Sequence, residues 1–570
     1  MNTATKGFLP ENFQVETWKP IEVFFIELAQ REITTAEQFR EWLRNRSELD
    51  AALQEELGWR YIRQTCDTNN EQKKEALHFF IREIEPHLAE YADKLNRKML
   101  ALPFGEQLND EKFSVFFRAV RKETEIFRQE NIPLQTEAQT LANEYGQILG
   151  AMSVEVNGKE LTLQQAAQFL KDTNRSLREE VYVKICRRRI NDSAQLDGLF
   201  DNLLKIRNQI ALNAGKANFR DYMFDALGRF DYTPEDCFAF HQSVKEHILP
   251  LIEAFESLRK SRLAYENLYP WDLEVDPDSK PALKPFVDGA ELIEKSAECF
   301  ARVKPAYGDL IRLMQQRGHL DLDSRLGKAP GGYNYPLYKS GLPFIFMNAA
   351  GSLRDMVTMM HEGGHAIHAW LTRDLELSAF KHTPSEIAEV ASMAMELISM
   401  EHWEVFFSNP VDLRRARLYQ LEKILGILPW IANIDAFQHW LYLHPAHTPA
   451  EREQVWVNLL NEYSGKVVDR SRYPEFERHS WHKQLHIFEV PFYYIEYGIA
   501  QLGAIGIWRN FKKDPENALR LYEEALAQGN QMTLPNLYKK AGVRFDFSAA
   551  YVKELAEFIQ QEMQAIESAQ

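Results

Sequence analysis

Several features that would assign a chain to a special class are scarce in this sequence of 570 residues. Its few cysteines include no CxxC pair, which argues against a disulfide framework or a zinc site built on paired thiolates and suits a reducing compartment; they are Cys66, Cys186, Cys237 and Cys299. No run of about 18 apolar residues is present, so no membrane span is expected. The N-terminus lacks a basic start followed by an apolar stretch, so no secretory signal is expected. Together these absences predict a soluble, cytoplasmic protein.

Positive charge is also in short supply. The chain has 67 Lys and Arg against 83 Asp and Glu, a formal net charge of −16. An excess of carboxylates repels nucleic-acid phosphates. The densest basic run, Lys184–Arg189, lies within a helical pattern and is interpreted as a solvated helix face. We therefore expect no nucleic-acid partner.

Glycine and proline, at 26 and 24 residues, are too few for a chain rich in turns and strands. A mainly α fold is predicted, because apolar residues recur at three- and four-residue spacing. At this length two or more domains are expected. We predict an N-terminal helical lobe over 1–200 and a catalytic domain over 201–570. The clearest helical patterns are Ala76–Leu100, Leu163–Ile190, Cys237–Leu258 and Ala549–Ile566.

Three short segments depart from the helical pattern. Val154–Leu161 alternates around Asn157-Gly158, which predicts a tight β-hairpin. Leu342–Asn348 is an apolar run too short for a helix and is expected to be extended. The glycine-rich loop Gly327–Tyr333 does not match a phosphate-binding loop, since no Ser or Thr follows its lysine, and we interpret it as a flexible hinge or lid.

The segment His361-Glu362-Gly363-Gly364-His365 has the HExxH pattern. Histidines four apart on a helix lie one above the other, so both imidazoles reach a single zinc ion. Glu362, rotated about 100° around the axis, stays off the metal but close to a water bound there. This arrangement is typical of zinc peptidases, with Glu362 as the general base. A helix that tolerates both glycines is expected to have a backbone or a substrate close against that face.

A catalytic zinc needs a third protein ligand. The metzincin extension is excluded, because His368 and Leu371 stand where Gly and His would be required. His368, one turn past His365, could support a ligand histidine, but we expect it to be an interior histidine. A second helix is predicted to start at Thr383 as N-cap and Pro384 as first residue. Spacing alone leaves Glu386 and Glu389 both open as ligands. Glu396, seven residues after Glu389, is a candidate to support a ligand histidine.

Two of these blocks resemble a known family. The run from Leu342 to His368 and the segment Glu389-Val-Ala-Ser392 are similar to the oligoendopeptidase F branch of the thimet oligopeptidase family of zinc metallopeptidases. The resemblance implies that Glu389 is the third ligand and that each chain holds one Zn²⁺. Gly363 departs from the family pattern, which has an aromatic residue there, so the pocket contour is expected to differ.

A third block, His486–Gly498, is similar to the family's C-terminal His/Tyr segment. By pattern alone an aromatic stretch at helical spacing is more often core than site. The resemblance implies that His486, Tyr494 and Tyr497 bind the substrate and the developing oxyanion, with Tyr493 still a candidate. His479 and His482 are expected at a surface or a lobe interface.

For the fold, the resemblance implies a two-lobed, clam-like helical protein with a deep internal channel and a few short strands near the active site. For the function, it implies a metalloendopeptidase that hydrolyses internal bonds of short peptides with a Glu-assisted, zinc-activated water. The extended segment Phe344–Asn348 is expected to pair with the substrate backbone. The rival hypotheses are a zinc carboxypeptidase of similar architecture and a non-catalytic peptide-binding protein.

Overall fold

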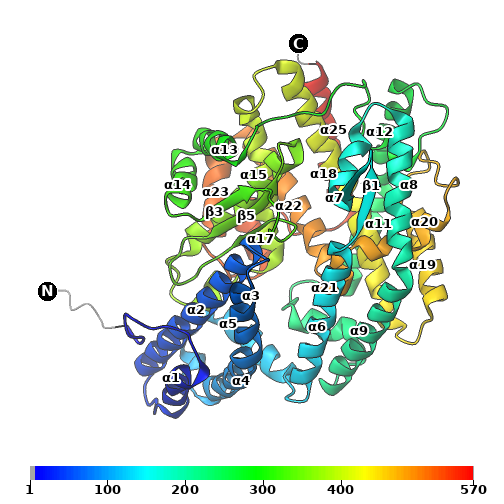
Figure 1. Cartoon of the computed structure of the whole chain (residues 1–570). Helices are drawn as coiled ribbons and strands as arrows, with labels where there is room; N and C mark the ends of the chain where they lie inside the picture. Colours follow the sequence, from blue (N-terminus) through cyan, green and yellow to red (C-terminus); the bar gives the residue numbers. More distant parts are fainter. Residues whose placement is uncertain (1–6, 109, 569–570) are drawn as a thin grey trace. The chain divides into compact units, whose positions relative to one another are not determined.

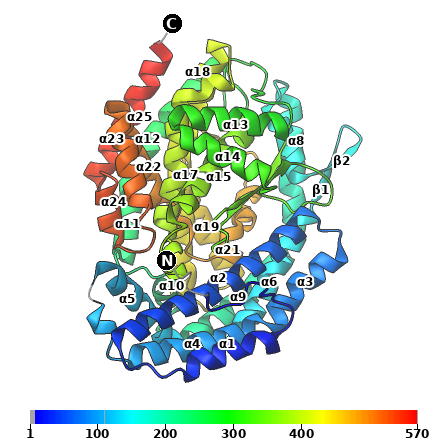
Figure 2. The same ribbon diagram turned by 90° about the vertical axis from the view of Figure 1, so that its left-hand side faces the viewer.

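A computed structural model describes residues 7–108 and 110–568 (Figures 1 and 2). It is 70% helix and 4% strand, which confirms the predicted mainly α class. Contacts within the chain define two compact units, each assembled from three stretches of sequence. The first unit is Met1–Gln129, Lys284–Leu413 and Gly503–Phe545, and the second is Glu130–Leu283, Arg414–Leu502 and Asp546–Gln570. The division of the sequence near residue 200 stays a prediction.

The first unit begins with five helices, blue in Figure 2, that pack around an aromatic core including Phe39, Trp42 and Phe117. Its later helices surround a small sheet. Its helices are α1 (Trp18–Gln30), α2 (Ala36–Cys66), α3 (Glu71–Glu83), α4 (Glu85–Ala101), α5 (Glu111–Ile126), α13 (Gly289–Val303), α14 (Pro305–Gln316), α15 (Leu353–Thr372), α16 (Ser378–Lys381), α17 (Ser385–Ser399), α23 (Pro515–Leu526) and α24 (Leu534–Lys540), with the short 3-10 helices η1 (Gly105–Gln107) and η4 (Met400–Val405).

The second unit is helical apart from one β-hairpin. The units divide within two long helices, α18 (Pro410–Leu443) and α22 (Tyr494–Lys513). The other helices of this unit are α6 (Asn131–Gly150), α7 (Leu163–Ala167), α8 (Arg175–Asn191), α9 (Ser193–Asn213), α10 (Phe219–Ala226), α11 (Pro234–His247), α12 (Leu249–Arg262), α19 (Pro449–Tyr463), α20 (Glu475–Arg478), α21 (Leu485–Glu489) and α25 (Ala549–Ser568), with η2 (Gln168–Lys171), η3 (Pro270–Asp272) and η5 (Ser480–Lys483).

The helices end where proline or a capping residue interrupts an apolar pattern. The pattern through Ala76–Leu100 is divided at Ile84, because Pro86 has no amide hydrogen and fits only the first turn of α4. Pro250 divides α11 from α12 in the same way. The pattern over Leu163–Ile190 is divided by Asn174, whose side chain caps α8. Each of these predicted stretches is therefore helical but not continuous.

The predicted hairpin is confirmed. Strands β1 (Ser153–Val156) and β2 (Lys159–Thr162) pair antiparallel across the two-residue turn. Asn157 and Gly158 both have positive φ, 53° and 74°, as a type I′ turn requires.

The first unit contains a three-stranded sheet in the order β3-β5-β4. Strand β3 (Leu320–Asp323) pairs parallel with β5 (Phe344–Ala349), and β4 (Tyr333–Tyr335) pairs antiparallel with the other side of β5. The extended conformation of β5 is as predicted. The expectation that this segment pairs with the substrate backbone is wrong, because both of its edges already carry hydrogen-bonded strands. Strand β4 lies at an edge.

The glycine-rich loop before β4 is anchored rather than built as a hinge. The side chain of Lys328 is fully buried, and its ammonium donates to the carbonyl oxygens of Asp321 and Asp323 and to a carboxylate oxygen of Asp321. Asn348 donates to the carbonyl oxygens of Ala329 and Gly331. A buried ammonium with several acceptors fixes the loop against β3 and β5.

Within the second unit, a buried ion pair joins two stretches of sequence. Arg178 on α8 donates to a carboxylate oxygen of Asp272 at 2.7 Å and to the carbonyl of Trp271 at 3.0 Å. Both charged side chains are fully buried.

Across the described residues, no helix is long and apolar enough to cross a membrane.

Candidate metal centre and active site

The HExxH motif lies in the middle of α15, whose start is fixed by its own sequence. Ser352 accepts from the amide of Asp355, and the Asp355 carboxylate accepts from the amide of Ser352, which forms a capping box. Strand β5 ends only a few residues earlier, at Ala349. The motif is therefore held by a well-defined helix that follows the central strand of the sheet.

The two glycines of the motif stand where α15 meets its neighbours. A Cβ at Gly363 would lie 2.3 Å from the Phe300 ring of α13, and a Cβ at Gly364 would lie 2.6 Å from Cα of Ser392 on α17. No side chain fits at either distance. The expectation of a close neighbour on this face is confirmed, and at Gly364 that neighbour is the backbone of α17.

This close packing of α15 against α17 brings His361, His365 and Glu389 together. The Nε2 atoms of His361 and His365 lie 3.3 and 3.6 Å from Oε2 of Glu389. One ligand atom from each of the three residues lies within 4.8 Å of the others. The structure starts α17 at Ser385, one residue later than predicted, because Pro384 has an extended ψ of 141° and serves as the N-cap.

Further side chains hold two of these three residues in place. Glu396 lies seven residues after Glu389, on the same face of α17. Its Oε1 is 2.7 Å from Nδ1 of His361. The hydroxyl of Ser392 donates to Oε2 of Glu389 at 3.2 Å. Partners of this kind fix the tautomer and orientation of metal ligands. The contact between Glu396 and His361 is the one that the predicted supporting role of Glu396 requires. The other candidate, Glu386, is buried on the first turn of α17.

Burial and neighbouring charges shift the pKa values of the side chains at this centre. The side chain of Glu362 is 6% exposed, and burial together with the nearby Glu389 and Glu396 raises the pKa of its carboxyl to about 7. Burial lowers the pKa of His365 to about 4, which keeps its imidazole neutral at pH 7, the form of histidine that can bind a metal. Burial opposes a charge on His361, but its bonds to Glu389 and Glu396 outweigh this effect and raise its pKa.

The residues of the C-terminal block gather in the second unit. The His486 ring lies 4.7 Å from the Tyr494 ring and 5.7 Å from the Tyr497 ring, between centroids. Tyr493 is 6.1 Å from the same ring. Tyr494 is buried, whereas the other two tyrosines are partly exposed. All three tyrosines therefore surround one histidine, and the choice among them stays a prediction.

A set of buried polar groups shapes the turn that carries these residues. Phe492 has a positive φ of 67°, which is unusual for a residue with a large side chain. Its amide donates to Gln438 at 2.8 Å, and its carbonyl accepts from Arg229. Arg207 donates to the carbonyl of Ile487 at 3.0 Å. These contacts fix the backbone between His486 and Tyr494.

The sequence did not indicate Gln484, which lies two residues before His486. Its side-chain Nε2 is 2.7 Å from Nδ1 of His486, and its Oε1 accepts from Trp430 at 3.0 Å. A residue that orients another through a side-chain contact leaves no spacing pattern, so no sequence signal was available. Asn334 on β4 was missed for the same reason; it donates to the backbone carbonyl of Glu362 at 3.4 Å.

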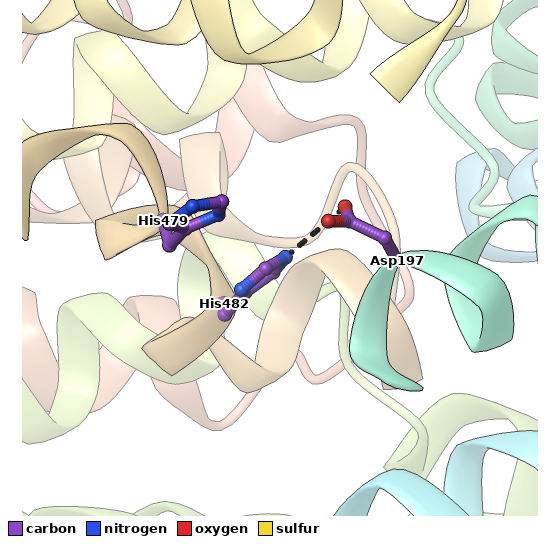
Figure 3. A group of neighbouring side chains, drawn as sticks. All are labelled: Asp197, His479 and His482. Carbon is purple, nitrogen blue, oxygen red and sulfur yellow. Dashed lines mark hydrogen bonds and ion pairs between the residues drawn. The ribbon is translucent and has the colours of Figure 1, made fainter. Parts of the chain in front are cut away.

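Three other histidines were placed by sequence reasoning. His368 is buried, as expected for an interior histidine. Of the two positions expected for His482, the surface is wrong, because its ring is buried and Nε2 lies 3.2 Å from Oδ1 of Asp197 on α9 (Figure 3); the lobe interface stays a prediction. The His479 ring stacks on the His482 ring, with centroids 5.5 Å apart.

Comparison with known proteins identifies the family of this chain. The model of Peptidase family M3 matches residues 168–557, and that of the Peptidase M3 N-terminal domain matches residues 8–127. The chain belongs to peptidase family M3. Peptidases of this family are metallopeptidases, and the chain contains groups of residues able to hold a metal ion.

Relatives of this family M3 peptidase carry the oligoendopeptidase F name. An oligoendopeptidase F homolog of Borreliella burgdorferi is 25% identical over 459 residues, 76% of this chain and 73% of the relative. Oligopeptidase PepF of Bacillus subtilis is 21% identical over 68% of this chain and 57% of the relative. The solved structure of Pz peptidase A with inhibitor 2 matches with a TM-score of 0.91 at 27% identity, over 97% of this chain and 99% of that one. The resemblance found in the sequence is confirmed.

Proposed function

We propose that this family M3 peptidase is a zinc-dependent oligoendopeptidase that hydrolyses internal bonds of short peptides. The observation that carries the proposal is the convergence of His361, His365 and Glu389, whose ligand atoms lie within 4.8 Å of one another. Two imidazole nitrogens and one carboxylate oxygen are the ligand set of catalytic zinc peptidases, and three protein ligands leave one coordination position open. The sequence relationship to oligoendopeptidase F supports the endopeptidase assignment.

The residues around this set suit a divalent cation. Three carboxylates, Glu362, Glu389 and Glu396, lie among two histidines in a buried site. Binding of a metal at Nε2 of His361 displaces the proton that these carboxylates otherwise favour on its ring. A zinc ion held there would act as a Lewis acid on the substrate carbonyl and lower the pKa of a water molecule toward neutrality.

Glu362 is the proposed general base. Its carboxylate would take the proton from the attacking water and return it to the leaving amine. Because burial raises its pKa to about 7, the carboxyl is poised to accept and to release a proton near neutral pH. His486, Tyr494 and Tyr497 are proposed to donate hydrogen bonds to the substrate and to the developing oxyanion. Their mutual proximity within the second unit supports a shared role.

The edge strand β4 is the proposed partner for the substrate backbone, in place of the paired strand β5. In the part of the chain that the structure describes, no strand pairs with its outer side, and Asn334 in its centre donates to the backbone carbonyl of Glu362. An extended peptide bound along β4 would add a fourth strand and be recognised mainly through its main chain. This mode of binding, together with the internal channel implied by the resemblance, favours short peptides.

The absence of any disulfide among the four cysteines supports a cytoplasmic location.

Replacement of Glu362 by Gln tests the proposal. The variant is expected to retain zinc, because the three ligands are unchanged, and to lose at least about a hundredfold in kcat, as expected for loss of a general base. The assay is cleavage of a peptide that is acetylated at its N-terminus and amidated at its C-terminus, with products identified by mass spectrometry. Internal cleavage is expected. Removal of single C-terminal residues from free peptides alone would indicate a carboxypeptidase, and binding without hydrolysis would indicate a non-catalytic protein.

A further inference from the structure

A second group of metal-binding side chain types lies outside the HExxH motif, on α11 and α18 of the second unit. Cys237 and His241 are four residues apart on α11, and Asp435 and His439 are four residues apart on α18. Residues at this spacing project from one face of a helix. Each helix therefore presents a pair of ligand types with the same spacing as His361 and His365.

The two pairs meet at the carboxylate of Asp435. Nε2 of His241 lies 2.9 Å from Oδ2 of Asp435, and Nε2 of His439 lies 3.2 Å from the same oxygen. Cys237, Asp435 and His439 each offer a ligand atom within 4.8 Å of the others. Ligand atoms around a tetrahedral zinc ion are separated by roughly 3.3 Å, and by slightly more where sulfur takes part. The two nitrogen–oxygen separations are thus close to those of a zinc site, and the sulfur of Cys237 lies within the wider limit of 4.8 Å.

These four side chains are almost inaccessible to solvent. Cys237, His241, Asp435 and His439 are 2%, 4%, 0% and 3% exposed. Among the described residues, Nδ1 of His439 and Oδ1 of Asp435 have no hydrogen-bond partner. Buried polar atoms nearly always have partners. The imidazole of His439 is instead enclosed by aromatic rings, with centroid distances of 4.8 Å to Phe238 and 5.4 Å to Phe492.

The charges of the proposed ligands suit a divalent cation. A carboxylate at Asp435 and a thiolate at Cys237 would together carry two negative charges, and a divalent ion bound between them would balance both in the buried core.

We propose that Cys237, Asp435 and His439 bind one divalent transition-metal ion, for which zinc is the best fit, as a structural site that ties α11 to α18, with His241 supporting the carboxylate of Asp435. One sulfur, one nitrogen and one oxygen supply three of the four positions of a tetrahedral ion, and the burial of these side chains separates the site from peptide substrates. A thiolate among the ligands disfavours calcium and magnesium. Metal binding forms the zinc–sulfur bond and releases the thiol proton to solvent.

The group Asp197, His479 and His482 in Figure 3 does not carry the same inference. Arg452, whose side chain is fully buried, already donates to Oδ1 of Asp197 at 2.8 Å. A metal cation on that oxygen would lie against the guanidinium.

The experiment counts metal ions and looks for sulfur coordination in the full chain. The protein is stripped on a chelating resin and refilled with Zn²⁺ or Co²⁺. We expect about two ions per chain and, with cobalt, a thiolate-to-cobalt charge-transfer band. The band is diagnostic because the three residues at the HExxH centre include no sulfur. Cys237→Ser is expected to remove the band and one ion, whereas His361→Ala removes the other ion and leaves the band.

Cys299→Ser is the matched control, because Cys299 is equally buried but lies on α13. It is expected to keep both ions and the band. A wild-type protein that refills with a single ion and shows no thiolate band would overturn the proposal, and so would a band that survives Cys237→Ser. The wild-type spectrum decides the question even if the Cys237 variant does not fold. A failed endopeptidase assignment would leave these metal measurements unaffected.

Discussion

The contact between Gly364 and α17 leads to a sharp prediction for Gly364→Ala. The new methyl would lie 2.6 Å from Cα of Ser392 and 2.7 Å from the carbonyl oxygen of Ala391. Ordinary contact begins near 3.4 Å, so α17 must move by about 0.8 Å. Both clashing atoms belong to backbone, and no rotamer change relieves them.

That displacement is large on the scale of metal coordination. Glu389 lies on the same helix, three residues before Ser392, and ligand distances hold to about 0.2 Å. We expect Gly364→Ala to weaken zinc binding and to lower kcat/KM by at least about tenfold, with an overpacking cost of about 1–3 kcal/mol in folding free energy. Zinc affinity is measured by competition with a chromogenic chelator, and hydrolysis with the blocked peptide.

Gly426→Ala is the matched control. Gly426 is a helical glycine in α18, and a Cβ there meets no atom within 4 Å. Alanine is favoured over glycine in a helix by about 1 kcal/mol, so this variant should melt at the same or a higher temperature and keep full activity. A folded Gly364→Ala protein with wild-type zinc affinity and turnover would refute the reasoning that the close helix contact sets the ligand geometry.

Two further predictions concern single carboxylates. Glu396→Gln should weaken zinc binding about 10–100-fold, because it replaces the charged partner of His361. The control Glu404→Gln changes an exposed carboxylate and should leave zinc binding unchanged. Zinc affinity is measured by competition with a chelator, and equal competition curves for the two variants would contradict the prediction. Glu256 is buried, which raises the pKa of its carboxyl to about 7. The folded protein therefore keeps a proton that the unfolded chain releases near pH 4.5, and stability falls as the pH rises between these values, by up to roughly 3 kcal/mol. The melting temperature of Glu256→Gln relative to wild type should rise as the pH is raised from 5 to 8. The control Glu266→Gln, at an exposed position, should show no such trend. A difference in melting temperature between Glu256→Gln and wild type that is the same at pH 5 and pH 8 would exclude the effect.

The sequence predicted the parts of this molecule that depend on local spacing. The hairpin at Asn157-Gly158, the helical class and the helix carrying His361 and His365 all follow from periodicity and turn chemistry. Gly363 and Gly364 indicated a close neighbour, although not which one. Between Glu386 and Glu389, local spacing was not enough, because the choice depends on how α15 and α17 pack.

The features that the sequence did not predict arise from contacts between distant segments. The position of β5 between two strands depends on pairing with β3 and β4, so its edges could not be judged from its own residues. Lys328 resembled a loop residue because most of its acceptors are backbone carbonyls, which any sequence supplies. The pairs Cys237/His241 and Asp435/His439 are nearly 200 residues apart, and only the fold brings them together.

The strand order of the small sheet has a consequence for how the protein is made. Strands β3 and β4 leave the ribosome before β5, yet neither pairs with the other, because β5 lies between them. The pairing of both strands in this sheet therefore depends on β5, which follows them in the sequence. The helix with His361 begins at Leu353, directly after β5 ends at Ala349. The same short stretch of sequence therefore completes the sheet and leads into the helix that carries His361 and His365, whereas Glu389 follows later in the chain, on α17.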